Sequence, residues 1–357
     1  MDNYKAQSDI RNLEKLRTLQ KDLPVVCSRF FRAVSQTTST LTRLAYAYDF
    51  RVFFQYLCME SPLFAEMTPA TIDEQSLNKI TGHDIELYQE YLMQYFKNTD
   101  NGQTLIQNHE LGIMRKMSSI RSLFDYLYKN GIISANVTTL IPLPKLHEKP
   151  ILRLDDEELK RMIHAAGTGE GLSERQEAFR KYTGARDYAM IMLFLGTGIR
   201  VSECVGLNID DIDFKDNAFA VTRKGGDRVI LYFPDEVAEA LQAYITLRRE
   251  IEAEPGHEAA LFLSMQRKRI TQRAVQNMVK KYALIAAPLK DRLSPHKLRS
   301  TYGTNLYLET GDIYLVADAL GHADVNTTRK HYADMTDDRR REAAKHVRLT
   351  KRTEDGK

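Results

Sequence analysis

The 357-residue sequence predicts a mainly α-helical protein of two domains, with a small β-sheet in the second domain, an α+β arrangement. Three observations predict this fold. Apolar residues recur at helical spacing along most of the chain, a β-hairpin pattern interrupts the helices near residues 219–233, and three prolines mark a non-periodic stretch at 134–150. The length also exceeds that of a typical single domain. We expect a helical domain at residues 1–140, a linker at 141–152, a second domain at 153–336 and a C-terminal tail at 337–357.

The first domain is predicted to be a small helical bundle. Apolar residues follow helical spacing at 40–57, 85–95 and 113–127. Thr40 is available to cap the first of these helices, and Gly131 follows the last one as a stop signal. Each segment has one apolar face, so the helices are expected to pack against one another.

The second domain combines helices with one hairpin. Asp155 and Glu158 have the spacing of a capping box, and the strongly apolar stretch 185–196 ends at Gly196 and Gly198, which predicts a core helix. Residues 219–223 and 228–233 alternate around Lys224-Gly-Gly-Asp, a pattern typical of a β-hairpin. Further helices are expected at 234–252, 271–285, 294–309, 312–320 and 327–333.

Composition excludes several classes of protein. Hydrophobic residues make up 43% and charged residues 28%, which is ordinary for a globular protein. No stretch approaches about 18 consecutive apolar residues, and residues 1–23 lack the apolar segment of a signal peptide, so we expect a cytoplasmic protein that does not enter a membrane. Cys27, Cys58 and Cys204 form no C-x-x-C pair, which predicts reduced thiols rather than disulfides or a zinc site.

Positive charge is concentrated in one segment of the second domain. Residues 267–299 hold ten Lys or Arg residues against a single acid, Asp291, although the net charge of the whole chain is only +3. Such an excess is typical of a nucleic-acid-binding face. An ordinary solvated helix surface explains it equally well.

One helix start has the composition of an anion site. Ser294 can cap it, Pro295 occupies the first turn, and His296 and Arg299 lie three residues apart, which places them on one face. Helix N-termini and guanidinium groups both favour a phosphate oxygen. On its own the pair is more often a surface cap with a solvated arginine.

Two further cations occupy defined positions. Arg200 follows the predicted core helix directly, which gives it a rigid mount, and Glu203 is spaced to hold its guanidinium group. Lys224 lies at the hairpin tip beside two glycines, from where it can reach DNA or donate a proton. Taken singly, a surface ion pair and a solubilising turn lysine are the commoner explanations.

Taken together, the motifs resemble those of the tyrosine recombinase and phage integrase family, which includes the Xer proteins. Five segments occur in family order, namely residues 197–203 (TGIRVSE), 224–228 (KGGDR), 295–301 (PHKLRST), 320–324 (LGHAD) and 331–333 (HYA). The resemblance spans roughly residues 37–334, and it implies an N-terminal core-binding domain that clamps DNA and a C-terminal catalytic domain. By position it also implies a catalytic set, with Glu203 in support: Arg200, Lys224, His296, Arg299, His322 and, as nucleophile, Tyr332. His322 and Tyr332 are ten residues apart, whereas nine is usual in many members, so the register before Tyr332 stays open.

The resemblance implies a reaction that needs neither metal nor cofactor. Tyr332 would attack phosphorus to form a 3′-phosphotyrosyl bond while His296 takes the phenolic proton and Lys224 protonates the leaving 5′ oxygen. His322 would hydrogen-bond a phosphate oxygen. Arg200 and Arg299 suit the phosphate charge because guanidinium groups stay protonated and donate two bonds in a fixed plane.

The expected partner is double-stranded DNA that carries a specific recombination site. Candidate DNA contacts in the first domain, each of which could also be simple surface exposure, are Thr40, Arg43, Lys116, Ser118, Ser119 and Arg121. The family resemblance further suggests a homotetramer in the synaptic complex, in which residues 337–348 pack on a neighbouring subunit. An accessory DNA-bending or excisionase protein is a possible further partner.

Two other functions fit part of the pattern. A type IB topoisomerase-like enzyme would use the same residue types to relax DNA without a specific site, and a noncatalytic DNA-binding regulator would need no complete catalytic set. The helical first domain and the Xer-like motifs favour recombination over both. The sequence leaves open the target site and the biological task, whether integration and excision, inversion or dimer resolution.

Overall fold

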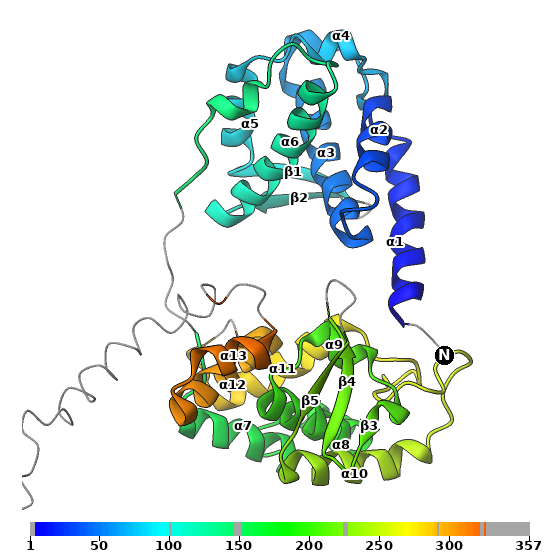
Figure 1. The fold of residues 1–357 in the computed structure, drawn as a ribbon, viewed down its shortest axis with the longest axis vertical. Coiled ribbons are helices and arrows are strands. Elements are labelled where there is room, and N and C mark those ends of the chain that lie inside the picture. Colours follow the sequence, from blue (N-terminus) through cyan, green and yellow to red (C-terminus); the bar gives the residue numbers. More distant parts are fainter. Residues whose placement is uncertain are drawn as a thin grey trace, which may run out of the picture. The chain divides into compact units, whose positions relative to one another are not determined.

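The computed structural model describes residues 4–99, 102–145, 152–223, 228–290 and 293–321, together with residue 325. The chain divides into two compact units, with the division between residues 149 and 150 (Figure 1). Both units are mainly helical with small antiparallel sheets, which confirms the predicted fold class. Each unit is described by itself.

The first unit is built on two long helices, α3 and α6, each of which supplies more residues to the buried core than any other element. Aromatic side chains dominate this core, and Phe53 contacts Phe54, Tyr88 and Phe124 with ring centroids 4.9–6.0 Å apart. The elements in order are α1 Tyr4–Gln20, α2 Val25–Ala33, α3 Thr40–Glu60, 3₁₀ turns at Pro62–Phe64 and Pro69–Thr71, α4 Glu74–Leu77, α5 Gly82–Tyr91, β1 Gln94–Thr99, β2 Gly102–Gln107, α6 Glu110–Lys129 and a 3₁₀ turn at Val137–Leu140.

Two local expectations for this unit were wrong. The helix expected to reach Tyr95 ends at Tyr91, and Tyr95 lies in β1, which pairs with β2. The apolar spacing continued through the boundary because the Tyr95 side chain is still buried, at 7% exposure. The cap of α3 is Ser39, whose Oγ accepts from the backbone N–H of Thr42 at 3.2 Å, whereas the Thr40 hydroxyl donates to Asp9.

A buried carboxylate joins α3 to α6. Asp49 is 2% exposed and accepts two bonds from the Arg115 guanidinium, at 2.6 and 2.7 Å, and one from the Ser119 hydroxyl at 2.6 Å. The Lys116 ammonium lies 3.9 Å from the same carboxylate. A buried charge is tolerated when its hydrogen bonds are satisfied, so these partners make Asp49 a structural link between the two core helices.

Replacing Asp49 with alanine should lower the free energy of unfolding of the first unit by about 2 to 3 kcal/mol, because Arg115 and Lys116 lose a buried partner. Urea titration followed by circular dichroism measures the change. The matched control is Asp125→Ala, which removes an exposed pair with Lys129 and should stay within about 0.5 kcal/mol of the wild type. Equal effects of the two substitutions would contradict the structural role of Asp49.

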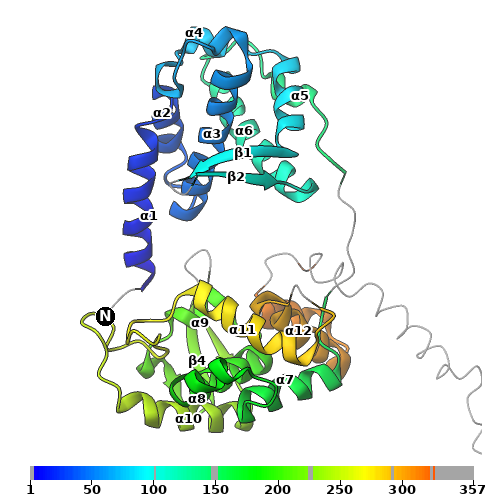
Figure 2. The ribbon, with the colours of Figure 1, turned by 180° about the vertical axis from the view of Figure 1, so that it is seen from behind.

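The second unit surrounds the helix α8, which contacts α7, α10 and α12 (Figure 2). A three-stranded antiparallel sheet in the order β3-β4-β5 completes it. The elements in order are α7 Asp156–Thr168, α8 Glu174–Thr197, α9 Val201–Gly206, a 3₁₀ turn at Ile209–Asp211, β3 Ile212–Asp213, β4 Ala218–Thr222, β5 Arg228–Tyr232, α10 Asp235–Arg249, α11 Gln272–Ala286, α12 Pro295–Thr310 and α13 Ile313–Leu320.

Most elements of this unit agree with the sequence prediction. The capping box of α7 is present, and β4 pairs with β5 from Ala218 opposite Tyr232 to Thr222 opposite Arg228. The helix α8 begins at Glu174 rather than at residue 185, because Ser173 and Gln176 form a capping box that starts it earlier. The short β3 was not predicted, and the expected helix at 327–333 lies outside the described residues.

Part of the basic segment 267–299 serves the fold itself. The Arg269 guanidinium is buried and donates to the carbonyls of Val205 and Leu207, at 3.1 and 2.8 Å. The ammonium of Lys281 binds Asp187 at 2.9 Å, and that of Lys290 binds Glu158. These three cations hold elements together, so the positive excess of the segment overstates the charge that it offers to a ligand.

Cys27 and Cys204 are buried and Cys58 is half-buried, and all three are free thiols. Burial raises the pKa of all three thiols above the ordinary range.

Among the helices that the structure describes, none is both long and apolar enough to cross a membrane.

Candidate active site

A rigid turn at the end of α8 carries Arg200. The Thr197 hydroxyl is buried, donates to the carbonyl of Leu193 at 2.6 Å and accepts from the Ile199 backbone N–H at 3.2 Å. Gly198 has φ +61°, the left-handed region that favours glycine, and a Cβ there would overlap the Tyr302 ring. The turn therefore holds the start of α9, and Arg200 with it, in one position.

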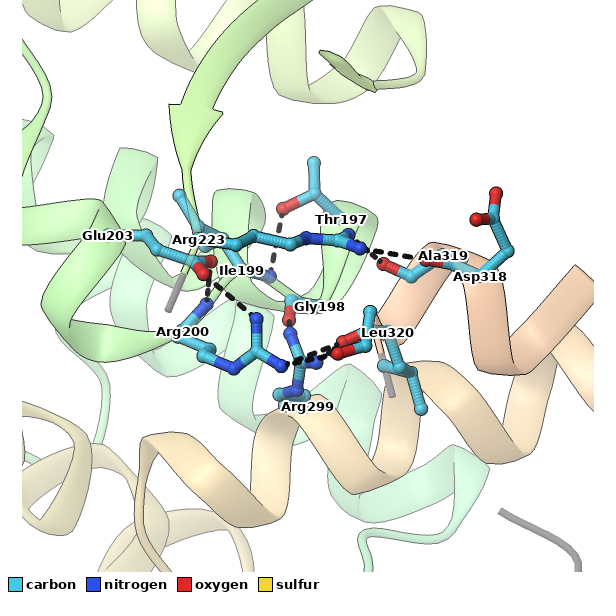
Figure 3. A network of polar contacts seen from close by, with 11 residues as sticks. Thr197, Gly198, Ile199, Arg200, Glu203, Arg223, Arg299, Asp318, Ala319 and Leu320 are labelled. Atoms are coloured by element: carbon cyan, nitrogen blue, oxygen red, sulfur yellow. Dashed lines mark hydrogen bonds and ion pairs between the residues drawn. The ribbon is translucent and has the colours of Figure 1, made fainter. Parts of the chain in front are cut away.

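The Arg200 guanidinium is held on two sides. Its Nη1 lies 2.9 Å from the Glu203 carboxylate, which also accepts from the Arg200 backbone N–H at 3.0 Å. Its Nη2 donates to the carbonyl oxygens of Gly321 and Leu320, at 2.8 and 3.2 Å (Figure 3). Glu203 orients the guanidinium, as its spacing predicts, and with 6% of its side chain exposed it is shielded from competing water.

Arg299 reaches the same place from the first turns of α12. Its guanidinium is buried, at 5% exposure, and donates to the carbonyls of Gly198 and Leu320 (Figure 3). Arg200 and Arg299 therefore share one acceptor, the carbonyl of Leu320, although their positions in the sequence are far apart.

A third arginine binds the same helix end. Arg223 follows β4, and its Nη1 and Nη2 donate to the carbonyls of Asp318 and Ala319, at 3.1 and 3.0 Å (Figure 3). The last carbonyls of a helix lack intrahelical partners and form the negative end of its dipole, which suits cations. The carboxyl end of α13 thus gathers three guanidinium groups; we call this the arginine cluster of Arg200, Arg223 and Arg299.

Sequence reasoning missed Arg223. The only signal was its position immediately before Lys224, at the end of a strand, and nothing in that pattern predicts a partner in α13. Burial lowers the pKa of Arg223, the nearby Glu203 carboxylate raises it and Arg200 lowers it.

The remaining catalytic candidates are only partly covered by the structure. His296 lies in the first turn of α12 and is exposed, whereas Arg299, three residues on, is buried. The expected Ser294 cap makes no side-chain hydrogen bond to the helix. Lys224, His322 and Tyr332 lie outside the described residues. Arg223, which precedes Lys224, belongs to the arginine cluster, and the carbonyl of Gly321, which precedes His322, accepts from Arg200.

The six candidate DNA contacts of the first unit differ in access. Ser118 is exposed; Thr40, Arg43, Lys116 and Arg121 are half-buried; Ser119 is buried. The Ser119 hydroxyl donates to Asp49 inside the unit, so it cannot reach a DNA groove, and that expectation is corrected. Arg121 donates to the carbonyl of Ile141, and burial lowers the pKa of Lys116.

In the described part of the chain, no group of three His, Cys, Asp or Glu side chains could hold a metal ion.

Comparison with known proteins decides the family. Residues 152–339 match the model of the phage integrase family. The chain belongs to this family. It is 31% identical over 330 residues to tyrosine recombinase XerC of Caldanaerobacter subterraneus subsp. tengcongensis, covering 90% of this chain and 86% of the relative. It is 29% identical over 343 residues to tyrosine recombinase XerS of Streptococcus thermophilus, covering 88% of this chain and 93% of the relative.

Solved structures share the fold of this tyrosine recombinase. The XerH recombinase bound to a palindromic difH substrate matches with a TM-score of 0.60 at 20% identity, over 90% of this chain and 84% of that one. The Tn1549 transposon integrase in complex with transposon right end DNA matches with a TM-score of 0.63 at 18% identity, over 90% and 99%. Family membership makes the chain an enzyme that breaks and rejoins DNA, and it favours neither the topoisomerase-like function nor the noncatalytic regulator.

The turn at Gly198 can be tested by comparing two glycines of the second unit. Gly256 has φ +82° with open space around it, so Gly256→Ala adds only backbone strain, about 1 kcal/mol. Gly198→Ala adds the overlap with Tyr302 and should lower the free energy of unfolding by about 1 to 3 kcal/mol more. Urea unfolding of the two variants measures the difference. Equal losses would show that the Tyr302 ring does not confine the turn.

Proposed function

We propose that this tyrosine recombinase cleaves DNA at a specific site by attack of Tyr332 on a phosphate held by Arg200 and Arg299. The observation that carries the proposal is the convergence of both guanidinium groups at the carboxyl end of α13. From there the chain continues directly into His322 and, ten residues later, Tyr332. Two fixed cations and a nucleophile on the next segment are what phosphoryl transfer by positioned charge requires.

The proposed reaction is a pair of transesterifications. The Tyr332 oxygen forms a bond to phosphorus, giving a 3′-phosphotyrosyl ester, and the bond to the 5′ oxygen breaks. His296 accepts the phenolic proton, and Lys224 gives a proton to the leaving 5′ oxygen. His322 hydrogen-bonds a phosphate oxygen. A 5′ hydroxyl from another strand then attacks the ester and releases Tyr332, so the energy of the broken linkage is kept for rejoining.

The proposed DNA partner is a double-stranded recombination site. Two proteins with this fold, XerH and the Tn1549 integrase, were solved on difH and transposon DNA. We assign residues 1–140 as the core-binding domain that clamps DNA, 153–336 as the catalytic domain and 337–357 as a tail that packs on a neighbouring subunit of a synaptic tetramer. Relaxation of a supercoiled plasmid that lacks any recombination site would instead favour a topoisomerase-like activity.

Tyr332→Phe should abolish covalent capture of a nicked suicide DNA, because the phenyl ring offers no oxygen to phosphorus, while DNA affinity stays within about twofold of the wild type. Denaturing gels measure the covalent product and mobility shifts measure binding. Tyr314→Phe is the matched control, since Tyr314 is 71% exposed on α13 and should leave capture unchanged. Full capture by Tyr332→Phe would refute the assignment of the nucleophile.

Truncation after Thr336 tests the proposed subunit contact. Loss of the tail should reduce complete strand exchange by about tenfold or more and leave binding to a single site nearly unchanged, because one subunit binds DNA without its neighbours. Recombination of a two-site plasmid and mobility shifts give the two readouts. An undiminished recombination rate would count against a tetramer coupled through this tail.

A further inference from the structure

Arg223 links the end of β4 to α13. It is the residue that follows β4, and in the sequence it immediately precedes Lys224. Both terminal nitrogens of its guanidinium donate to α13, to the carbonyls of Asp318 and Ala319. The Arg223 side chain therefore holds the chain just after β4 to a helix that lies about 95 residues further along the sequence.

The backbone of α13 is shaped to fit this guanidinium. Gly321 ends the helix with φ +58°, and a Cβ on it would overlap the terminal atoms of Arg223. Glycine is therefore required here for two reasons, its left-handed conformation and the space that Arg223 fills. The same glycine carbonyl accepts from Arg200, so one peptide unit borders two members of the arginine cluster.

The charges around Arg223 explain how its guanidinium remains cationic at the carboxyl end of α13. Arg200 carries a like charge nearby, and both this charge and burial disfavour the cationic form of Arg223. The Glu203 and Asp318 carboxylates compensate, and the negative end of the α13 dipole adds to their effect. A guanidinium can donate to two neighbouring carbonyls at once, whereas an ammonium group presents a single point charge.

We infer that Arg223 is a positioning residue: it anchors the end of β4 to the carboxyl end of α13, where Arg200 and Arg299 also bind, and so sets the point from which the chain continues into Lys224. The inference rests on the proposed role of Lys224 as the acid for the leaving 5′ oxygen. Consecutive Cα atoms lie about 3.8 Å apart, so an anchor at Arg223 restricts the point from which the next side chain starts. A small misplacement of a catalytic group costs rate without costing affinity.

A sulfur substitution at the leaving atom separates this role from a general structural one. In a suicide DNA whose scissile phosphate has sulfur in place of the 5′ bridging oxygen, the leaving group is a thiolate. A thiol has a pKa of about 8.5, far below that of an alcohol, so the thiolate leaves without a proton from the protein. A defect in acid positioning should disappear on this DNA, whereas a defect in phosphate binding or folding should persist.

Arg223→Ala should cleave the oxygen-containing DNA about 10- to 100-fold more slowly than the wild type and the sulfur-containing DNA at a rate within about twofold of it. Arg223→Lys should give an intermediate loss on oxygen and none on sulfur, and it carries the test if the alanine variant folds poorly. Arg161→Ala is the matched control. Arg161 donates to the carbonyl of Ala286 at 2.9 Å, also at the carboxyl end of a helix, α11, and its loss should leave both rates unchanged.

Two further variants separate failure of the inference from failure of the proposed function. Lys224→Ala should also be slow on oxygen and restored on sulfur, and Tyr332→Phe should be inactive on both. If Lys224→Ala is restored but Arg223→Ala is equally slow on both DNAs, or not slow at all, the inference is overturned alone. If Lys224→Ala is equally slow on both, the acid assignment fails and the inference fails with it; cleavage by Tyr332→Phe overturns the proposed nucleophile.

Discussion

The second unit is organised around the carboxyl end of α13, where backbone carbonyls accept hydrogen bonds from Arg200, Arg223 and Arg299. Three like charges repel one another, and the carbonyls and negative dipole of the helix end, together with the Glu203 carboxylate, offset this repulsion. These bonds join three elements of distant sequence origin, namely α9, the end of β4 and α12, to one helix. The two arginines proposed to hold the phosphate, Arg200 and Arg299, are therefore placed by contacts of the fold itself.

This construction suits the proposed chemistry. The turn at Gly198 and the Thr197 hydroxyl fix Arg200, while burial fixes Arg299, so the two guanidinium groups need little rearrangement when a phosphate arrives. The Arg200 guanidinium has five N–H donors and 33% of its side chain is exposed, so it can bind a ligand in addition to Glu203 and the carbonyls. The basic segment 267–299 contributes less than its composition suggests, because several of its cations, including Arg269 and Lys281, hold the core.

Local signals predicted the helices of the second unit and its hairpin well, because caps, left-handed glycines and alternating residues each specify a backbone conformation. Glu203 was also predictable, since it lies one helical turn from Arg200. Contacts between distant segments were not predictable. No residue near Arg223 in the sequence indicates that its partner lies in α13, and no residue near Ser119 indicates that it is buried against Asp49. The early start of α8 depends on a polar capping box that lies outside the apolar stretch. In the first unit, β1 and β2 were missed because Tyr95 keeps the apolar spacing of the preceding helix.

In the proposed reaction, Arg200 balances the charge of the scissile phosphate. The most direct measurement compares Arg200→Ala with the wild type on two suicide DNAs, one with an ordinary scissile phosphate and one with a neutral methylphosphonate at that position. The account predicts a loss of cleavage of about 100- to 1000-fold on the charged DNA and a rate within about tenfold of the wild type on the neutral one. An equal loss on both DNAs would contradict it.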